Sequence, residues 1–497
     1  NVNPITRLDY PDPDVIRVED TYYMVSTTMH FMPGCEILQS FDLVHWEHAT
    51  YVYETLDHTD AQQLKSGQNI YGQGMWAASL RYHEGRFYIC FVANDTRKTY
   101  LYTSEKIDGP WKKQLIEGFY HDGSLLFDED GRNYIVYGND EIWITELNED
   151  LTAPKKDGLH RLLVSDHKNP ELGYEGSHIQ KINGYYYIFL VHSLRDRWMR
   201  TEACFYSDSL EGEFTGGDVL CDDRGYCGQG VAQGGIVDTP DGKWYAMLFQ
   251  DSGAVGRIPI LLPVTWKNHF PFFGQNGHVP EEIEVHSTRP GYIYQPLVGS
   301  DDFCNGLLPR WQFNHDPDPR YYHLDALQGT YTITTREVCT ELTQAVNTLT
   351  QRMSYPSCAA EVTVDASALK EGDVAGLCAL QGCYAAVGIT KHHGKYEVLM
   401  LDKKEDGILD MTEGTVVESH QMDFRLEADF CNMKDEARCY YRVNKGDWLP
   451  IGTVHKLYFK LDHFTGCRFG LFCYAAEETG GSACFRDFKY YDVDEIS

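Results

Sequence analysis

A hairpin pattern occurs five times in the first half of the chain, and no other feature of the sequence constrains the fold as strongly. Each copy has a short apolar run, a tight polar turn and an aromatic-rich run; the copies are DPDVIRVEDTYYMVS, WAASLRYHEGRFYICF, DGSLLFDEDGRNYIVY, EGSHIQKINGYYYIFL and QGGIVDTPDGKWYAML. The turn dipeptides EG, DG, NG and DG suit hairpins, because glycine accepts the positive φ that such turns require. The chain is therefore expected to build one sheet from each copy.

The spacing of the turn glycines indicates how these sheets are arranged. Gly85, Gly131, Gly184 and Gly242 follow one another at intervals of 46, 53 and 58 residues. One blade of a β-propeller takes about 40 to 50 residues, and longer loops stretch it. Together with the first copy, whose turn ends at Asp20, the spacing predicts five blades.

The same register shows which residue begins each copy. This position lies twelve residues before the aromatic that follows the turn, or eleven in the shorter first copy, and the residues there are Asp12, Trp76, Asp122, Glu175 and Gln233. Equivalent positions on blades around one axis lie on one ring. We therefore expect three carboxylates, a tryptophan and an amide to converge at one mouth of the central channel.

The repeat weakens after GRIPILLPVTW, and a second domain follows. The segment EVHSTRPGYIYQPLVGSDDF contains two prolines and two glycines and is typical of a linker. Alternating strand runs come next, among them GTYTITT, AAEVTVDA, YEVLMLD and RFGLFCY. The predicted fold class is all-β, with a five-bladed propeller over residues 1–296 and a jelly-roll-like β-sandwich over residues 297–497.

Charge and cysteine content limit the partners and the compartment. The chain has 43 Lys and Arg against 74 Asp and Glu, a net charge of −31, so we expect no nucleic-acid and no membrane partner; a neutral ligand such as a sugar fits better. Fifteen cysteines without a CxxC pair favour a reducing compartment.

The opening NVNPITRLDYPDPD has no signal-peptide pattern, and no run of 18 apolar residues occurs. A cytoplasmic protein is expected, or a secreted one if a leader precedes this sequence.

The three carboxylates of the ring match what acetal hydrolysis requires. An acid protonates the leaving oxygen, and a second carboxylate across the sugar attacks carbon or activates water. Three close carboxylates do not all ionise easily, so the pKa of one should rise, as a general acid working near neutrality requires. Taken singly, Asp12, Asp122 and Glu175 could each be an ordinary turn residue. Their common register favours the catalytic interpretation.

Three sequence blocks resemble those of family 43 of the glycoside hydrolases, five-bladed propellers that act as β-xylosidases, α-L-arabinofuranosidases and arabinanases with inversion at the anomeric carbon. The blocks are NPITRLDYPDPDVIRVEDTYY, HDGSLLFDEDGR and YEGSHIQKINGYYYIF, and the resemblance extends over both domains. It implies that Asp12 is the general base and Glu175 the general acid. Asp122 corresponds to the residue that tunes the pKa of the acid and orients the substrate.

The resemblance implies further substrate-binding residues. Arg257 in VGRIPILLPV matches an active-site arginine that reaches sugar hydroxyls. Trp76 in GMWAASLRYH and Phe31 in TTMHFMPGCEIL match aromatic positions that line the sugar pocket, with His30 and Gln233 as additional candidates. The aromatics could instead belong to the propeller core, and the arginine could be an exposed residue at a strand end.

One position departs from the family pattern. Many relatives have a histidine at the head of the fifth copy, where it helps to hold a calcium ion, whereas this chain has Ala232 and Gln233 in VAQGGIVD. We expect no required cofactor, with a structural calcium as an open alternative. The trailing domain, with LPRWQFNHDPDP near its start, resembles the C-terminal module of exo-acting relatives, which packs on the propeller near the active-site mouth and narrows the pocket.

The predicted function is exo-acting, inverting hydrolysis that releases terminal β-D-xylose or α-L-arabinofuranose from xylo- or arabinoxylo-oligosaccharides. Two alternatives stay open: an arabinanase or galactanase of the same fold, and a non-catalytic carbohydrate-binding propeller, because fold alone does not determine function. The sequence does not separate xylosidase from arabinofuranosidase, since both pentoses can present similar hydroxyl arrangements to one pocket.

Overall fold

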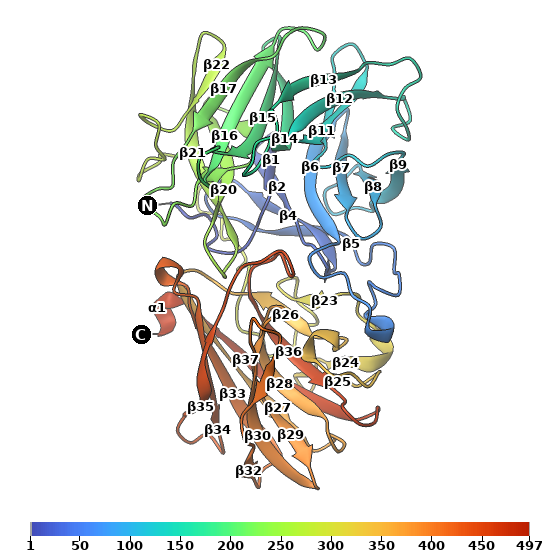
Figure 1. The fold of residues 1–497 in the computed structure, drawn as a ribbon, viewed down its shortest axis with the longest axis vertical. Helices are drawn as coiled ribbons and strands as arrows, with labels where there is room; N and C mark the ends of the chain where they lie inside the picture. Colours follow the sequence, from blue (N-terminus) through green and yellow to red (C-terminus); the bar gives the residue numbers. More distant parts are fainter. Residues whose placement is uncertain (1, 497) are drawn as a thin grey trace.

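The computed structural model describes residues 2–496 and consists of two all-β domains, one above the other in Figure 1. The N-terminal domain, blue to yellow-green, is a five-bladed propeller, and the C-terminal domain, yellow to red, is a β-sandwich. The predicted fold class is therefore confirmed. In this view both ends of the chain lie on the same side of the molecule, near the junction of the domains.

Five antiparallel sheets form the blades. The first contains β1 (Asp14–Val18), β2 (Thr21–Ser26), β4 (Gly34–Ser40) and β5 (Glu47–Tyr53), and the second β6 (Met75–His83), β7 (Arg86–Ala93), β8 (Lys98–Ser104) and β9 (Lys112–Ile116). The third contains β10 (Ser124–Phe127), β11 (Asn133–Asn139), β12 (Glu141–Leu147) and β13 (His160–Ser165), and the fourth β14 (Glu175–Ile182), β15 (Tyr185–Ser193), β16 (Arg200–Ser207) and β17 (Thr215–Leu220). The fifth contains β18 (Val231–Ala232), β19 (Ile236–Asp238), β20 (Trp244–Asp251), β21 (Arg257–Lys267) and β22 (Phe270–Phe273).

The predicted hairpin turns have the backbone conformation that their glycines permit. Gly85, Gly131, Gly184 and Gly242 have φ values of 79°, 86°, 85° and 83°. No atom lies within 4 Å of the place where a Cβ would stand at any of them. The left-handed conformation, and not lack of space, therefore requires glycine at these turns.

The segment before Asp12 joins the first blade to the last. The backbone N–H of Ile5 donates to the carbonyl of Pro259 at 2.8 Å, and that of Tyr10 donates to Arg257 at 3.1 Å. These bonds use the part of β21 that β22 does not cover. The closure places Asp12 beside the start of β21, where Arg257 lies.

The sandwich consists of two sheets and begins after a linker that bonds to Phe41 of the propeller through Thr288 and Tyr294. One sheet contains β23 (Gln312–Asn314), β26 (Leu349–Arg352), β28 (Val374–Leu380), β29 (Ala385–His392), β30 (Lys395–Lys403), β31 (Leu409–Met411), β32 (Thr415–Val417) and β36 (Arg468–Tyr474). The other contains β24 (Tyr322–Asp325), β25 (Thr330–Thr334), β27 (Ser357–Asp365), β33 (Gln421–Asp429), β34 (Glu436–Arg442), β35 (Leu449–Lys456) and β37 (Ser482–Tyr491). The helical pieces are η1 (Lys65–Gly67), η2 (Pro319–Tyr321), η3 (Leu342–Gln344), η4 (Cys431–Met433) and α1 (Val493–Ile496).

One strand of the propeller belongs to a sheet of the sandwich. β3 (Phe31–Met32) leaves the first blade and pairs with β23, with Phe313 opposite Met32 and Asn314 opposite Phe31. This pairing adds backbone hydrogen bonds to the packing between the domains. The two domains are therefore joined by a shared sheet as well as by the linker.

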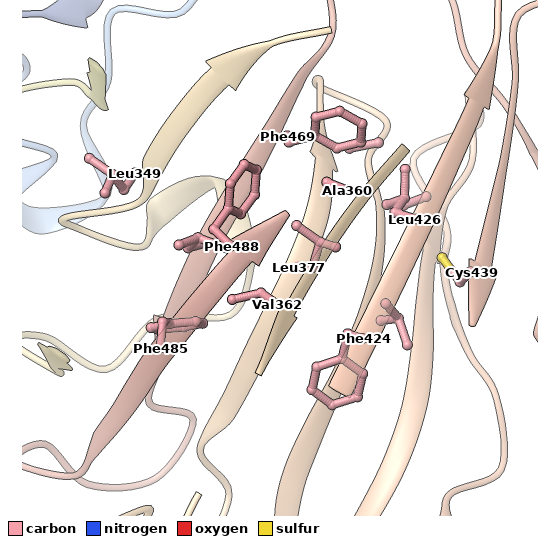
Figure 2. Close-up of a cluster of buried hydrophobic side chains, with 14 of the residues drawn as sticks. Leu349, Ala360, Val362, Leu377, Phe424, Leu426, Cys439, Phe469, Phe485 and Phe488 are labelled. Carbon is pink, nitrogen blue, oxygen red and sulfur yellow. The ribbon is translucent and has the colours of Figure 1, made fainter. Parts of the chain in front are cut away.

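Apolar side chains fill the space between the two sheets of the sandwich (Figure 2). The labelled residues come from both sheets and are at most 3% exposed; they are Leu349, Ala360, Val362, Leu377, Phe424, Leu426, Cys439, Phe469, Phe485 and Phe488. Alternating inward positions on facing sheets are what a sandwich core requires. Within residues 2–496, no helix has the length and apolar character needed to cross a bilayer.

Candidate active site

The five residues that begin the sequence repeats lie together at one end of the propeller channel. They line one cavity with a free volume of about 50 Å³. The other lining residues are Met29, Ala77, His121, Arg200, Arg257 and Phe464. The structure thus brings the ring of Asp12, Trp76, Asp122, Glu175 and Gln233 together, as the common register predicts.

Asp12 is buried and is held by three hydrogen-bond donors. Its Oδ1 accepts from Gln233 Nε2 at 2.8 Å and from Arg257 Nη1 at 3.3 Å. Its Oδ2 accepts from the Thr27 hydroxyl at 2.7 Å. These donors come from the first and fifth blades, so the carboxylate orientation depends on the closure of the propeller.

Three residues of the ring have a left-handed backbone. The φ values are 54° for Asp12, 48° for Asp122 and 71° for Gln233. Residues other than glycine pay about 1–3 kcal/mol for such conformations, and they gather at functional sites. In the fifth blade this conformation interrupts the inner strand between β18 and β19, which both pair with β20. The Gln233 side chain reaches Asp12 from this break.

Glu175 and Asp122 are linked through His121, which sequence reasoning did not include. His121 Nε2 lies 3.1 Å from Glu175 Oε2 and 3.2 Å from Asp122 Oδ2. Asn139 Nδ2 also donates to Glu175 Oε2, at 3.0 Å, and the backbone N–H of Gly176 donates to Asp122 Oδ2 at 2.8 Å. The sequence predicted that Asp122 acts on Glu175 directly, whereas the structure has the His121 imidazole between the two carboxylates.

The pKa values of this cluster describe an ion pair. Burial lowers the pKa of His121, but the charge of Asp122 and the hydrogen bonds to Asp122 and Glu175 outweigh it and raise that pKa to about 11. Burial raises the pKa of Asp122, and the neighbouring His121 reverses this and holds it below its usual value. At neutral pH His121 is an imidazolium and Asp122 a carboxylate.

Arg257 lies beside Asp12 with unused donors. It is 3% exposed, and its guanidinium stands 4.6 Å from the centroid of the Phe464 ring. Within residues 2–496, its Nε and Nη2 have no hydrogen-bond partner. A buried unpaired donor costs about 1–3 kcal/mol, and more when charged. A ligand with hydroxyl groups would relieve this cost, which fits the expected contact of Arg257 with sugar hydroxyls.

The sandwich contributes an aromatic wall to the cavity. Phe464, in the loop between β35 and β36, stacks on Trp76 with ring centroids 5.7 Å apart and an interplanar angle of 13°. Asp9 holds this loop: its Oδ2 accepts from Thr465 Oγ1 at 3.2 Å and from the backbone N–H of Gly466 at 2.9 Å. Its Oδ1 accepts from the backbone N–H of Arg257 at 2.8 Å. The buried Asp9 carboxylate therefore fixes the position of both the Arg257 backbone and the loop that contains Phe464.

Phe31 and His30 do not reach the cavity, contrary to the prediction. Phe31 is fully buried, pairs with Asn314 through β3 and lies under the Arg468 guanidinium. His30 is also fully buried and packs on Phe31 and on residues of the sandwich. The chain turns at Met29, which has a φ of 53° and lines the cavity in their place. The cause is the pairing of β3 with the sandwich, which draws the two following residues into the junction.

The structural calcium ion that the sequence left open has no clear set of ligands among the described residues. Among the described residues, one group brings three possible ligand atoms within 4.8 Å of one another, namely His121, Asp122 and Glu175. Calcium takes six to eight oxygen ligands, and this group offers one nitrogen and two oxygens that already bond to each other. Gln233 uses its amide nitrogen on Asp12. We assign no metal ligands to these residues, and a structural calcium stays an open alternative.

Comparisons with known proteins identify the family of both domains. Residues 2–271 match the model of glycosyl hydrolases family 43, and residues 300–491 match that of the beta-xylosidase C-terminal concanavalin A-like domain. A beta-xylosidase of Formosa agariphila is 26% identical over 99% of this chain and 89% of its own length. A xylosidase/arabinosidase of Butyrivibrio fibrisolvens is 24% identical over 99% of both chains. Among solved structures, a bifunctional GH43-CE protein of Bacteroides eggerthii has a TM-score of 0.93 and 41% identity; all of this chain matches 64% of that one.

Proposed function

The chain belongs to family 43 of the glycosyl hydrolases and is a glycosidase, and we propose that it removes single terminal pentoses, β-D-xylose or α-L-arabinofuranose, from xylo- or arabinoxylo-oligosaccharides. Relatives named beta-xylosidase and xylosidase/arabinosidase that align over nearly the whole chain support this substrate class. The Bacteroides eggerthii chain is longer and bifunctional, so the proposal concerns the activity of the two domains described above.

The confinement of the cavity carries the exo-acting part of the proposal. Three carboxylates line a free volume of about 50 Å³, and the Phe464 ring from the sandwich closes one side of it. A small cavity walled in part by the second domain suits the terminal ring of a chain better than the middle of a polymer. Release of single sugars follows from such a pocket.

From the assignment of Asp12 as base and Glu175 as acid we infer a one-step displacement. Asp12 takes a proton from water while the water oxygen attacks the anomeric carbon, and Glu175 gives its proton to the glycosidic oxygen as the bond to that carbon breaks. The products are an alcohol and a pentose of inverted configuration, with one proton left on Asp12 and one missing from Glu175. Exchange with solvent restores both groups. The Arg257 donors hold the sugar hydroxyls during the step.

Parallel hydrolysis of nitrophenyl β-D-xyloside, α-L-arabinofuranoside and β-D-galactoside tests the substrate class. One or both pentosides should be cleaved at least 100-fold more efficiently than the galactoside. Digests of xylan and arabinan should contain the monosaccharide as the first product. A preference for the galactoside, or early release of long oligosaccharides, would contradict the proposal and favour a galactanase or an arabinanase.

A further inference from the structure

His121 stands between the two carboxylates that the proposed mechanism needs in different protonation states. Its Nε2 lies within 3.2 Å of both Asp122 Oδ2 and Glu175 Oε2. Its backbone carbonyl accepts from the N–H of Gly138 at 3.0 Å, which holds the loop before β10 against β11. The Trp76 ring packs edge-on against the imidazole, with centroids 6.0 Å apart. The imidazole is thus fixed in place and 21% exposed toward the cavity that the substrate would enter.

We propose that His121 is a positioning residue for the general acid: its imidazolium bridges Asp122 and Glu175, offsets the charge of Asp122 at Glu175, and sets the upper pH limit of activity. This inference rests on the proposed function, because it assigns a role within that reaction. It also changes the expected role of Asp122. The imidazolium of His121 offsets part of the Asp122 charge, so Asp122 does not act on Glu175 alone.

The hydrogen bonds also determine which oxygen of Glu175 carries the reactive proton. His121 Nε2 and Asn139 Nδ2 both bond to Oε2. Among the described residues, Oε1 has no hydrogen-bond partner. An oxygen that already accepts two donors is a poor place for a proton, so the transferable proton resides on Oε1. His121 therefore orients the carboxyl group as well as changing its charge environment.

Titratable or permanently charged groups from four blades face this cluster. They are Asp12 from the first blade, Asp122 from the third, His178 and Arg200 from the fourth, and Arg257 from the fifth. Arg257 is bonded to Asp12, and Arg200 Nε is bonded to Asp251 at 2.9 Å. His121 is the cation in direct contact with Glu175 among the described residues. Loss of its charge leaves Glu175 facing the Asp122 carboxylate.

The sign of the effect follows from this contact. A cation beside a carboxyl group favours the ionised form of that group, and removal of the cation favours the protonated form. His121→Gln keeps a donor near Glu175 Oε2 but removes the charge, so the alkaline limb of kcat/KM should move to higher pH, by about one unit or more. Asp122→Asn removes the opposing charge and should move that limb to lower pH. The double variant loses one charge of each sign, and its limb should return close to the wild-type position.

A second bridged histidine provides the matched control. His192 Nδ1 lies 2.9 Å from Asp166 Oδ2 and its Nε2 lies 2.6 Å from Asp218 Oδ1, so it too joins two carboxylates. None of the three lines the cavity. His192→Gln should leave the pH profile on nitrophenyl pentosides unchanged. The comparison separates an effect on Glu175 from the general cost of removing a buried imidazole.

The test combines pH profiles with a readout that does not need turnover. Nitrogen-15 NMR of the wild-type imidazoles, assigned by the signal missing in His121→Gln, should show His121 protonated at pH 8, in line with its pKa raised to about 11. A neutral His121 at that pH would overturn the proposal. So would an alkaline limb that stays in place in His121→Gln while melting temperature or KM changes, since that is the result of a structural role.

Failure of the proposed function would give a different experimental result from failure of the His121 proposal. In that case the wild-type enzyme cleaves no pentoside, and the NMR result still decides whether His121 is a bridging cation. If His121→Gln does not fold, His121→Asn provides the uncharged variant for the same profile. A limb that moves to lower pH in either folded variant contradicts the assigned sign.

Discussion

The propeller and the sandwich contribute to the cavity in different ways. The propeller supplies the three carboxylates, which stand at the equivalent position of three blades, and the residues that hold them. The sandwich supplies one aromatic ring, Phe464, from a loop tied down by Asp9. In the proposed function, the chemistry therefore comes from the repeated architecture, whereas confinement of the substrate comes from the appended domain.

Removal of a propeller carboxylate should have the largest effect and sharpen this division. Asp12→Ala removes the group placed to activate water, and kcat should fall about 1,000-fold or more on every substrate. Steady-state kinetics and circular dichroism measure turnover and fold. Near-normal kcat in a folded Asp12→Ala protein would show that another residue is the base.

Glu175→Ala should have an effect that depends on the leaving group. Protonation matters most when the departing oxygen is strongly basic, so xylobiose should lose far more activity than an aryl pentoside with an acidic phenol. We expect about 1,000-fold loss on the disaccharide and about tenfold loss on a dinitrophenyl pentoside. Equal losses on both substrates would remove Glu175 from the role of acid.

A change in the sandwich should have a smaller effect of another kind. Phe464→Ala removes the ring that stacks on Trp76 and lies over the Arg257 guanidinium. Loss of such a stacking contact costs about 0.5–1.5 kcal/mol, so KM should rise by up to about tenfold while kcat changes little.

Leu461 is the control for that variant. It lies in the same loop, is 74% exposed and does not line the cavity. Leu461→Ala should leave KM and kcat unchanged. If Phe464→Ala instead reduced kcat as severely as Asp12→Ala, the division between chemistry in the propeller and confinement in the sandwich would be broken.

The repeat explains why much of the architecture and the ring could be predicted. The turn glycines mark the register, and the register places Asp12, Asp122 and Glu175 on one ring before any distance is known. Such periodic information exists where each copy must form the same hairpin. It does not extend to residues outside the shared position.

The residues that the sequence missed lie outside that register. Phe464 is in an irregular loop of the other domain, and the prediction for Phe31 was wrong because pairing between β3 and β23 decides where it points. His121 directly precedes Asp122, which was among the predicted site residues, but His121 itself was not predicted. Its HDG context placed an ionisable ring beside Asp122, but only the fold shows that the imidazole also meets Glu175.

The anomeric configuration of the first-formed sugar tests the central claim most directly, because Asp12 and Glu175 are assigned to an inverting displacement. Proton NMR of a digest of nitrophenyl β-D-xyloside, recorded before mutarotation, should show α-xylose as the first product. The assignment requires the two carboxyl groups to stand about 6.5 to 9.5 Å apart, with room for water. First-formed β-xylose would mean retention, and it would contradict the roles given to both residues.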